Sequence, residues 1–194
     1  MSGPSATRVA AVVPAAGQST RFGSRKLIAD VGGVALLERT LASLLQAGVE
    51  RVIVVVRHGD AFDAVPSLAD ARVATIVNPD PDRGMFSSIQ TGLAVAGGDA
   101  VLVLPADMPF VPARAVAAVA ARAAETDSVV VPVHDGRKGH PIAIPRPLCD
   151  RLLTVPPTTT LKDALAGLGA ATVRLDVTEP GILHDVDSPA DLTR

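Results

Sequence analysis

The stretch from Ala15 to Lys26 carries residue types that could bind a polyphosphate. It directly follows an apolar run, Val9 to Val13, which predicts a short buried strand. Small residues and two glycines let a ligand approach the backbone, and the cations include Arg21 and Arg25. Free backbone N–H groups beside cations suit an anion. We therefore expect an anion-binding loop here. The alternative is an ordinary loop that carries surface charge.

A single carboxylate, Asp107, follows another apolar run and lies between two prolines. The run, 101–104, predicts a buried strand, and Pro105 and Pro109 stiffen the turn after it. Mg²⁺ prefers carboxylate oxygen beside phosphate, and a rigid strand end can present it. The alternative is that Asp107 caps the helix expected near Pro112, but it lies too far upstream for an N-cap. We therefore expect Asp107 to bind Mg²⁺.

A second acidic group, Asp185 and Asp187, lies near the end of the sequence. Alternate side chains of an extended segment point to the same side, so both carboxylates can face one ligand. Ser188 and Pro189 could begin a terminal helical turn directly after them. The alternative is a capped helix with solvated acids. The sequence leaves open which aspartate touches a metal ion, with Asp187 favoured.

The segment after the apolar run Val73 to Val77 could contact a nucleotide. The amide of Asn78 could face the edge of a base. Gly84 and Ser88 follow at the start of an expected helix, whose N-terminus favours anions. The alternative is a proline-stiffened loop in which Ser87 is the N-cap.

The composition restricts the class of protein. The 194 residues suit one domain, expected over 9–194 after a disordered tail at 1–8. A net charge of −2 gives no support for binding to nucleic acid or a membrane surface, and no apolar run approaches the length of a membrane span. The single Cys149 cannot form an internal disulfide, so we expect a packed thiol and a cytoplasmic protein.

Apolar runs and helical patterns alternate along the chain. Strands are predicted over 9–13, 51–56, 73–77, 101–104, 129–133, 142–144 and 172–175, and helices over 36–45, 61–69 (a short helix interrupted at Pro66), 85–96, 112–125, 147–152, 161–168 and 189–193. This alternation predicts an α/β fold with three layers and a doubly wound, mostly parallel sheet, as in Rossmann-like proteins. Ligands of such sheets bind beyond the carboxyl ends of the strands. The loops that begin at Ala15, Asn78 and Pro105 lie there.

The spacing of the first loop excludes two familiar motifs and resembles a third. Neither G-x-x-x-x-G-K-[ST] nor G-x-G-x-x-G fits, because Leu27 follows Lys26, and Gln18 and Ser19 follow Gly17. The order A-A-G-x-S-x-R-[FM]-G-x-x-K after an N-terminal strand resembles the signature loop of nucleotidyltransferases of the MobA/MocA type. The segments N-P-D-P-D-R-G-M-F-S-S, P-A-D-M-P, G-H-P and D-V-D-S-P-A-D-L resemble further motifs of this family, so the resemblance covers nearly the whole chain.

The resemblance implies a reaction and a set of site residues. Members of the family transfer a nucleoside monophosphate from a nucleoside triphosphate to a phosphorylated acceptor, of which molybdopterin is the best known. Motif by motif, the resemblance implies catalytic roles for Arg21, Lys26 and Asp107; nucleotide binding by Ala15, Ala16, Gly17, Ser19, Arg21, Lys26, Asn78, Gly84 and Ser88; acceptor binding by Arg137, Gly139, His140 and Asp185; and Mg²⁺ binding by Asp107 and Asp187. For His140, a structural loop residue is the alternative.

The branch of the family is suggested by Ala16. The guanylyltransferases typically carry Gly there, the cytidylyltransferases resemble the Ala-Ala-Gly of this chain, and an extra Cβ disfavours the larger purine. The resemblance therefore implies CTP, a molybdopterin-type acceptor and a molybdenum hydroxylase as partner.

Two departures from the family pattern stand beside this interpretation. Phe22 replaces the commoner Met, and Leu104-Pro105 precedes the aspartate where many relatives carry Gly. The alternatives are a guanylyltransferase of the same family, an NAD(P)-dependent oxidoreductase that uses the nucleotide pocket for its cofactor, and a non-catalytic binding protein.

Overall fold

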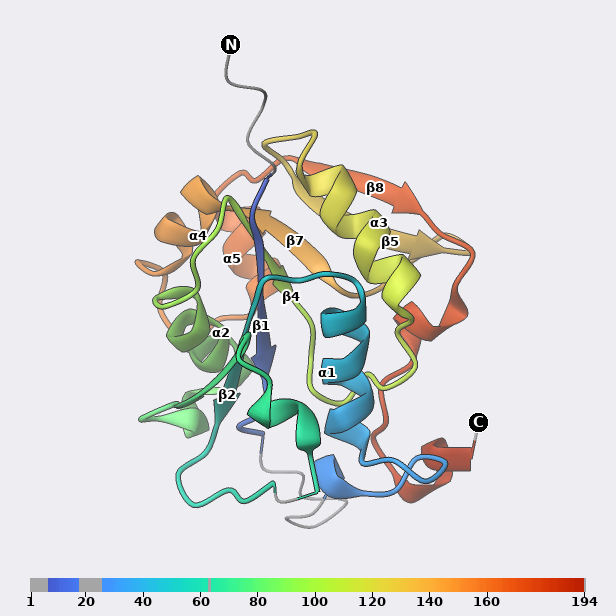
Figure 1. The fold of residues 1–194 in the computed structure, drawn as a ribbon. Coiled ribbons are helices and arrows are strands. Elements are labelled where there is room, and N and C mark those ends of the chain that lie inside the picture. Colours follow the sequence, from blue (N-terminus) through green and yellow to red (C-terminus); the bar gives the residue numbers. More distant parts are fainter. Residues whose placement is uncertain (1–6, 18–25, 63, 194) are drawn as a thin grey trace.

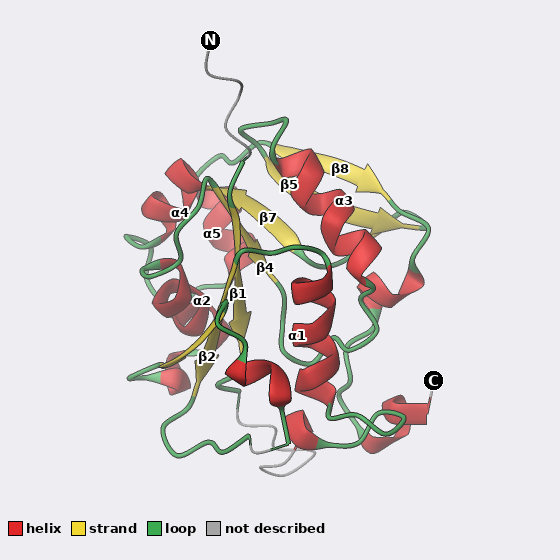
Figure 2. Ribbon diagram, viewed as in Figure 1, coloured by secondary structure: helices red, strands yellow, loops and turns green. Residues whose placement is uncertain are grey.

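The computed structural model describes residues 7–17, 26–62 and 64–193, and these form one sheet with helices on both faces (Figures 1 and 2). The strands are β1 (Val9–Pro14), β2 (Arg51–Val56), β3 (Val73–Val77), β4 (Ala100–Val103), β5 (Val129–His134), β6 (Arg137–Lys138), β7 (Ile142–Pro145) and β8 (Thr172–Asp176). Their order is β3-β2-β1-β4-β7-β5-β6, with β8 paired to β5. The neighbours from β3 to β4 are parallel, β7 is antiparallel to β4 and β5, and β8 is parallel to β5. The mostly parallel sheet confirms the predicted fold class.

Helices cover the two faces of the sheet because alternate strand residues point to opposite sides. The helices are α1 (Leu36–Gln46), α2 (Met85–Leu93), α3 (Ala113–Ala123), α4 (Arg146–Leu152) and α5 (Leu161–Gly167). Ala11 and Val13 of β1 belong to the core cluster that includes residues of α1 and α3. Ala10 and Val12 belong to the cluster that includes residues of α2, α4 and α5. The three-layer arrangement follows from this alternation and is visible in Figure 1.

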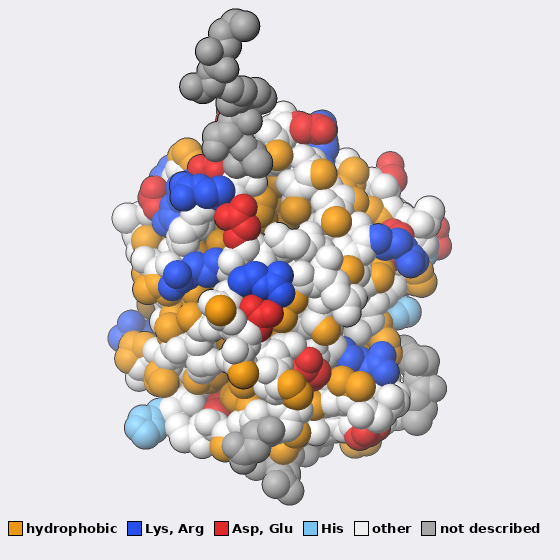
Figure 3. Space-filling model, in the orientation of Figure 1, with side chains coloured by type: hydrophobic (Ala, Val, Ile, Leu, Met, Phe, Trp, Pro, Cys, Tyr) orange, Lys and Arg blue, Asp and Glu red, His pale blue; other side chains and the backbone are white. Residues whose placement is uncertain are grey.

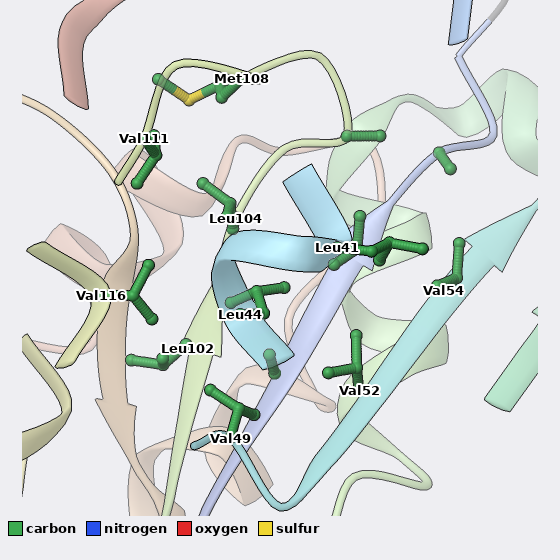
Figure 4. Packing of buried hydrophobic residues seen from close by; sticks show 14 of the residues in the cluster. Leu41, Leu44, Val49, Val52, Val54, Leu102, Leu104, Met108, Val111 and Val116 are labelled. Atoms are coloured by element: carbon green, nitrogen blue, oxygen red, sulfur yellow. The ribbon is translucent and has the colours of Figure 1, made fainter. Parts of the chain in front are cut away.

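Branched apolar side chains fill the space between α1 and the sheet. Leu41 and Leu44 of α1 lie over Val52 and Val54 of β2 and near Leu102 of β4 (Figure 4). All five side chains are fully buried. Burying one such side chain stabilises the fold by about 1.5–3 kcal/mol. The strand ends that carry the polar loops therefore start from a well-packed core.

The helix predicted over 61–69 is wrong. Among the described residues of this range, only the 3₁₀ turn η2 (Pro66–Ala69) is helical. Pro66 has no N–H to donate to a preceding turn, so it begins this short element and does not continue a helix. The helix predicted over 85–96 ends sooner, at Leu93, where the guanidinium of Arg146 donates to the carbonyl oxygens of Leu93 and Ala96. Side-chain capping from α4 thus replaces the last predicted turn of α2.

The segment after β8 returns to the carboxyl edge of the parallel strands. It contains two 3₁₀ turns, η4 (Pro180–Leu183) and η5 (Pro189–Thr193). Val186, between them, is fully buried in a small cluster with Leu36 of α1. In Figure 1 the red η5 lies near the blue η1 (Lys26–Ile28), which begins the described chain after the first loop. Residues distant in sequence are therefore brought together at this edge.

The remaining sequence expectations concern the tail, the surface and the cysteine. Of the predicted tail 1–8, residues 1–6 lie outside the described residues, and Arg8 donates its backbone N–H to Asp99 Oδ2 at 2.9 Å. Charged side chains of both signs are interspersed on the face in Figure 3. No helix in the described chain combines the length and the apolar character needed to cross a bilayer. Cys149 is buried in α4, and burial raises the pKa of its thiol to about 12, which confirms a packed, protonated side chain.

Candidate active site

Lys26, Asp107 and Asp187 meet at the carboxyl edge of the sheet. The Lys26 ammonium donates to Asp107 Oδ2 at 2.8 Å and lies 3.4 Å from Asp187 Oδ1. Lys26 is only 7% exposed, although it is charged. The three residues come from η1, from the turn after β4 and from the segment before η5. The structure thus brings together the predicted catalytic lysine and both predicted metal ligands.

The turn that carries Asp107 is held by backbone bonds to its neighbours. Leu104 and Ala106 donate their N–H groups to the carbonyl oxygens of Val12 and Pro14, at 3.1 and 3.3 Å, so the pairing of β4 with β1 continues past the end of the strand. The carbonyl of Ala106 also accepts the hydroxyl of Thr40 in α1 at 3.0 Å. The sequence did not predict that Thr40 supports the turn of Asp107, because the partner of a buried threonine in a helix cannot be read from the sequence.

Asp187 is positioned by the segment around it. Val186 donates its N–H to the backbone oxygen of Asp107 at 2.9 Å, which joins the two acidic segments directly. Asp191 Oδ2 accepts the N–H groups of Asp187 and Ser188 at 3.2 and 2.9 Å. Asp185 and Asp187 are exposed while Val186 is buried, as the predicted alternation requires. Of the two aspartates, Asp187 is the one that contacts Lys26.

Two carboxylates converging on one cation fit the demands of a divalent metal ion. Asp107 and Asp187 both approach the same ammonium, so a cation between them would meet oxygen from each. Within the described chain, no group of three or more His, Cys, Asp or Glu side chains is placed to hold a metal. Mg²⁺ needs fewer, because it is commonly bound by one or two carboxylates, with substrate phosphates and water completing its shell.

His140 is a predicted acceptor residue that lies near enough to this centre to be affected by its charges. Burial lowers the pKa of its imidazole, although the carboxylates of Asp107 and Asp185 oppose that shift. The backbone N–H of His140 donates to the carbonyl oxygen of Ile182 at 3.0 Å. A Cβ on Gly139 would collide with the same carbonyl, so glycine is required for this close approach. The G-H-P loop is therefore fixed against η4.

Arg137 is placed differently from the other predicted acceptor residues. It is exposed in β6, and its backbone pairs with His134 of β5. Among the described residues, no recorded hydrogen bond or ion pair joins its side chain to the Lys26 centre. An acceptor role for Arg137 thus depends on how far a bound molecule extends along the edge.

Asn78 and Ser88 lie together, but their polar groups face each other. Asn78 Nδ2 donates to the hydroxyl oxygens of Ser87 and Ser88, both at 2.9 Å, and Asn78 Oδ1 accepts the N–H of Asp80 at 3.0 Å. The three side chains are 3–6% exposed. Ser87 is not the N-cap: Gly84 is, at φ 101°, and the Ser87 hydroxyl donates to its carbonyl at 2.7 Å. This cluster joins the end of β3 to the start of α2.

The first loop is described only at its two ends. Ala15 and Ala16 are buried, and Ala15 donates its N–H to the carbonyl of Val55 at 2.7 Å. Gly17 is exposed, and a Cβ placed on it would meet no atom within 4 Å. Ser19 and Arg21, predicted to bind the nucleotide, lie outside the described residues, as do Phe22 and Arg25.

Arg57 belongs to the same edge and was not predicted as a site residue. It follows β2 directly, and one of its terminal nitrogens donates to Asp82 Oδ1 at 2.8 Å. The sequence could have indicated Arg57 as a site residue only by its position directly after a buried strand. Its Nε atom is buried without a hydrogen-bond partner among the described residues, which only the three-dimensional structure can reveal.

Comparison with known proteins agrees with this geometry. The family model described as "MobA-like NTP transferase domain" matches residues 11–176. The chain is 30% identical over 192 residues to a probable molybdenum cofactor guanylyltransferase of Natronomonas pharaonis, covering 94% of each chain. It is 24% identical over 182 residues to the molybdenum cofactor cytidylyltransferase of Escherichia coli K12, covering 93% of this chain and 91% of that one.

Other similarities cover a shorter segment or concern the fold. Over 129 residues the chain is 36% identical to the 2-C-methyl-D-erythritol 4-phosphate cytidylyltransferase of Rhodococcus opacus, a match that spans 64% of this chain and only 55% of that enzyme. The structure of Rv0371c from Mycobacterium tuberculosis in complex with manganese superposes with a TM-score of 0.77 at 22% identity, covering 97% of both chains. Taken with the family match, these findings show that the chain is a nucleotidyltransferase of the MobA-like NTP transferase family.

Proposed function

We propose that this protein transfers CMP from CTP to the phosphate of a molybdopterin-type acceptor and releases pyrophosphate. The observation that carries the proposal is the convergence of Lys26, Asp107 and Asp187, at 2.8 and 3.4 Å, on the sheet edge where ligands of this fold bind. A cation between two carboxylates, next to a loop rich in small residues, suits a metal-bound triphosphate.

The reaction needs positioning and charge neutralisation more than covalent catalysis. An oxygen of the acceptor phosphate forms a bond to the α-phosphorus, and the bond from that phosphorus to the bridging oxygen of the β-phosphate breaks. The electron pair leaves with pyrophosphate. A phosphate dianion is already nucleophilic, so no general base is required, and the reaction assigns no proton transfer to His140.

In this proposal Asp107 and Asp187 hold Mg²⁺, which neutralises charge on the phosphates when it is bound. Lys26 now holds the position between the two carboxylates. When the metal and the triphosphate bind, the ammonium of Lys26 turns to the phosphates and, together with Arg21, stabilises the charge that builds on the leaving group. The solved structure of Rv0371c with manganese is consistent with a divalent ion in this fold.

CTP and molybdopterin are the narrower parts of the proposal. Ala16 is buried and carries the Cβ that disfavours a purine. The two relatives named for the molybdenum cofactor differ in their base, and the Rhodococcus opacus relative is named as a cytidylyltransferase for another phosphorylated acceptor. The G-H-P loop, with Gly139 and His140 near Asp107 and Asp185, is proposed to border the acceptor. A molybdenum hydroxylase as recipient of the product stays a prediction, as does a cytoplasmic location.

The experiment is pyrophosphate release with each of the four nucleoside triphosphates in Mg²⁺. Each is combined with molybdenum cofactor, with 2-C-methyl-D-erythritol 4-phosphate or with no acceptor. We expect turnover with CTP and molybdenum cofactor. If GTP is the only nucleotide that reacts with molybdenum cofactor, the protein is the guanylyltransferase of the alternative. Turnover with the erythritol phosphate would show that the proposed acceptor is wrong. Failure of every pairing, with NADH or NADPH bound in the absence of Mg²⁺, would replace the transferase with the oxidoreductase alternative.

A further inference from the structure

Arg57 lies between two segments that are proposed to bind the nucleotide. The last paired residue of β1, Pro14, lies beside Val55, and the last of β3 lies beside Val56. The next residues along the three parallel strands are Ala15, Arg57 and Asn78. The side chain of Arg57 is 30% exposed and leaves the sheet at its carboxyl edge, where ligands of such sheets bind.

The guanidinium of Arg57 has a buried donor without an acceptor. One terminal nitrogen donates to Asp82 Oδ1 at 2.8 Å, in the 3₁₀ turn η3 (Pro81–Arg83) before α2. Nε is buried, and among the described residues it has no hydrogen-bond partner; it is the one buried side-chain nitrogen or oxygen there in that state. Buried donors in folded proteins are nearly always paired, and an unpaired one on a charged group is costly. A bound acceptor atom would account for it.

The order of the strands separates the edge into two parts. Lys26 and Asp107 lie on the β4 side of β1, whereas Arg57 and Asn78 lie on its β2 and β3 side. Neighbouring strands are about 4.8 Å apart, so the ends of β4 and β2 are separated by roughly 10 Å. A nucleotide whose phosphates lie at Lys26 can therefore extend across β1 and place its base near Arg57.

The base needs a hydrogen-bond donor that Asn78 does not offer. The amide nitrogen of Asn78 already donates to Ser87 and Ser88, and its oxygen accepts the N–H of Asp80. The buried Nε–H of Arg57 is a donor at this part of the edge that has no acceptor among the described residues. Guanine and the pyrimidines carry carbonyl oxygens on their edges, whereas adenine carries an amino group and ring nitrogens.

We propose that Arg57 binds the base of the nucleoside triphosphate, with Nε–H donating to a carbonyl oxygen of the base. The proposal rests on the proposed nucleotide site and adds a residue that contacts the base. Asp82 holds the guanidinium in place through its terminal nitrogen. The alternative is that Arg57 only tethers the loop before α2.

The test is direct measurement of ligand binding by calorimetry in Mg²⁺, with CTP, GTP, UTP, ATP and inorganic tripolyphosphate as ligands. The variant is Arg57→Lys, which keeps the charge and loses Nε. The matched control is Arg83→Lys in η3, where Arg83 Nε is paired with Asp80 at 2.6 Å. We expect Arg57→Lys to weaken the preferred triphosphate about tenfold, the effect of one lost hydrogen bond to a charged group, and to leave tripolyphosphate, which has no base, within about twofold. Arg83→Lys should bind all five ligands as the unaltered protein does.

Several results would overturn the inference. Unchanged binding of the preferred triphosphate by Arg57→Lys would show that Arg57 does not contact the base. An equal loss for tripolyphosphate would assign the contact to phosphate. A loss in Arg83→Lys as large as that in Arg57→Lys would show that the loop before α2, and not Arg57 Nε, determines binding. If Arg57→Lys does not fold, Arg57→Gln is measured with the same ligands. An unaltered protein that binds no triphosphate would contradict the proposed function itself.

Discussion

Two polar clusters lie at the carboxyl edge of the sheet, and each contains residues predicted to contact the nucleotide or its metal. In the cluster of Asn78, Ser87 and Ser88, the side chains are neutral, buried and hydrogen-bonded to one another or to nearby backbone. In the cluster of Lys26, Asp107 and Asp187, two carboxylates share one ammonium, and side-chain exposure rises from 9% through 24% to 58%.

The difference between the two clusters indicates that one stabilises the fold and the other can take part in the reaction. The neutral cluster uses the amide of Asn78 and the hydroxyl of Ser87 internally, so it stabilises the position of α2 relative to β3. A charged cluster that is open on one side has unused carboxylate oxygens, which can bind a metal ion. We therefore expect changes in the charged cluster to remove activity and changes in the neutral cluster to reduce stability.

The largest effect is expected from Asp107→Asn. The variant keeps the size of the side chain but loses the charge that holds the metal, so pyrophosphate release should fall on the order of a hundredfold or more. Its thermal unfolding is measured in parallel to show that the loss is not one of folding. Asp135→Asn serves as control, because Asp135 is exposed at φ 48° and asparagine tolerates that conformation. Near-normal turnover by Asp107→Asn would exclude Asp107 from the metal site.

Asn78→Ala should have the opposite pattern. It leaves the Ser87 and Ser88 hydroxyls and the Asp80 N–H without their partner, which costs about 1–3 kcal/mol of unfolding free energy. Urea unfolding measures this loss, and kcat should stay within a few-fold of the unaltered enzyme. A large rise in KM for the triphosphate at unchanged stability would indicate that Asn78 contacts the base of the nucleotide, as the sequence predicted.

Lys26→Met tests whether the lysine and the metal compete for the same carboxylates. The ammonium lies 2.8 Å from Asp107 and 3.4 Å from Asp187, so its removal should strengthen Mn²⁺ binding to the nucleotide-free protein by about tenfold or more. Electron paramagnetic resonance of free Mn²⁺ gives the affinity directly, and Lys138→Met on the exposed β6 controls for the lost positive charge. Equal Mn²⁺ affinity in Lys26→Met and the unaltered protein would mean that the ion binds elsewhere.

The smallest effects are expected within the neutral cluster. Ser88 accepts one bond from Asn78, whereas Ser87 also donates to the carbonyls of Gly84 and Asp80. Ser88→Ala should therefore cost about 1 kcal/mol and Ser87→Ala slightly more, with triphosphate affinity unchanged in both. A loss of affinity in Ser88→Ala alone would separate the two serines and assign Ser88 to the nucleotide.

The sequence predicted the fold well because most of its signals are local. Continuous β-branched runs such as 51–56 and helical spacing such as 36–45 hold in the structure, and strand alternation placed Lys26 and Asp107 at one edge. The helix predicted over 61–69 was wrong because the described part of this range forms only a 3₁₀ turn that begins at Pro66. The missing N–H of Pro66 outweighs the helical spacing of the apolar residues around it.

The orientation of side chains was less predictable. Asn78 could face a base or its own helix, and the choice depends on where the 3₁₀ turn η3 places Ser87 and Ser88. Arg57 was missed because an unpaired Nε is not a property of sequence. Ser19 and Arg21 lie outside the described residues, so their nucleotide-binding roles stay predictions.

The backbone bond from Val186 to Asp107 has a consequence for the synthesis of the protein. A ribosome adds Asp187 161 residues after Lys26, when every strand of the sheet has already been made. A nascent chain that has reached β8 therefore contains the lysine and the first carboxylate but lacks the second. The cation site can therefore assemble only late in translation. A product that stops after β8 should contain every strand of the sheet but lack the second carboxylate, Asp187.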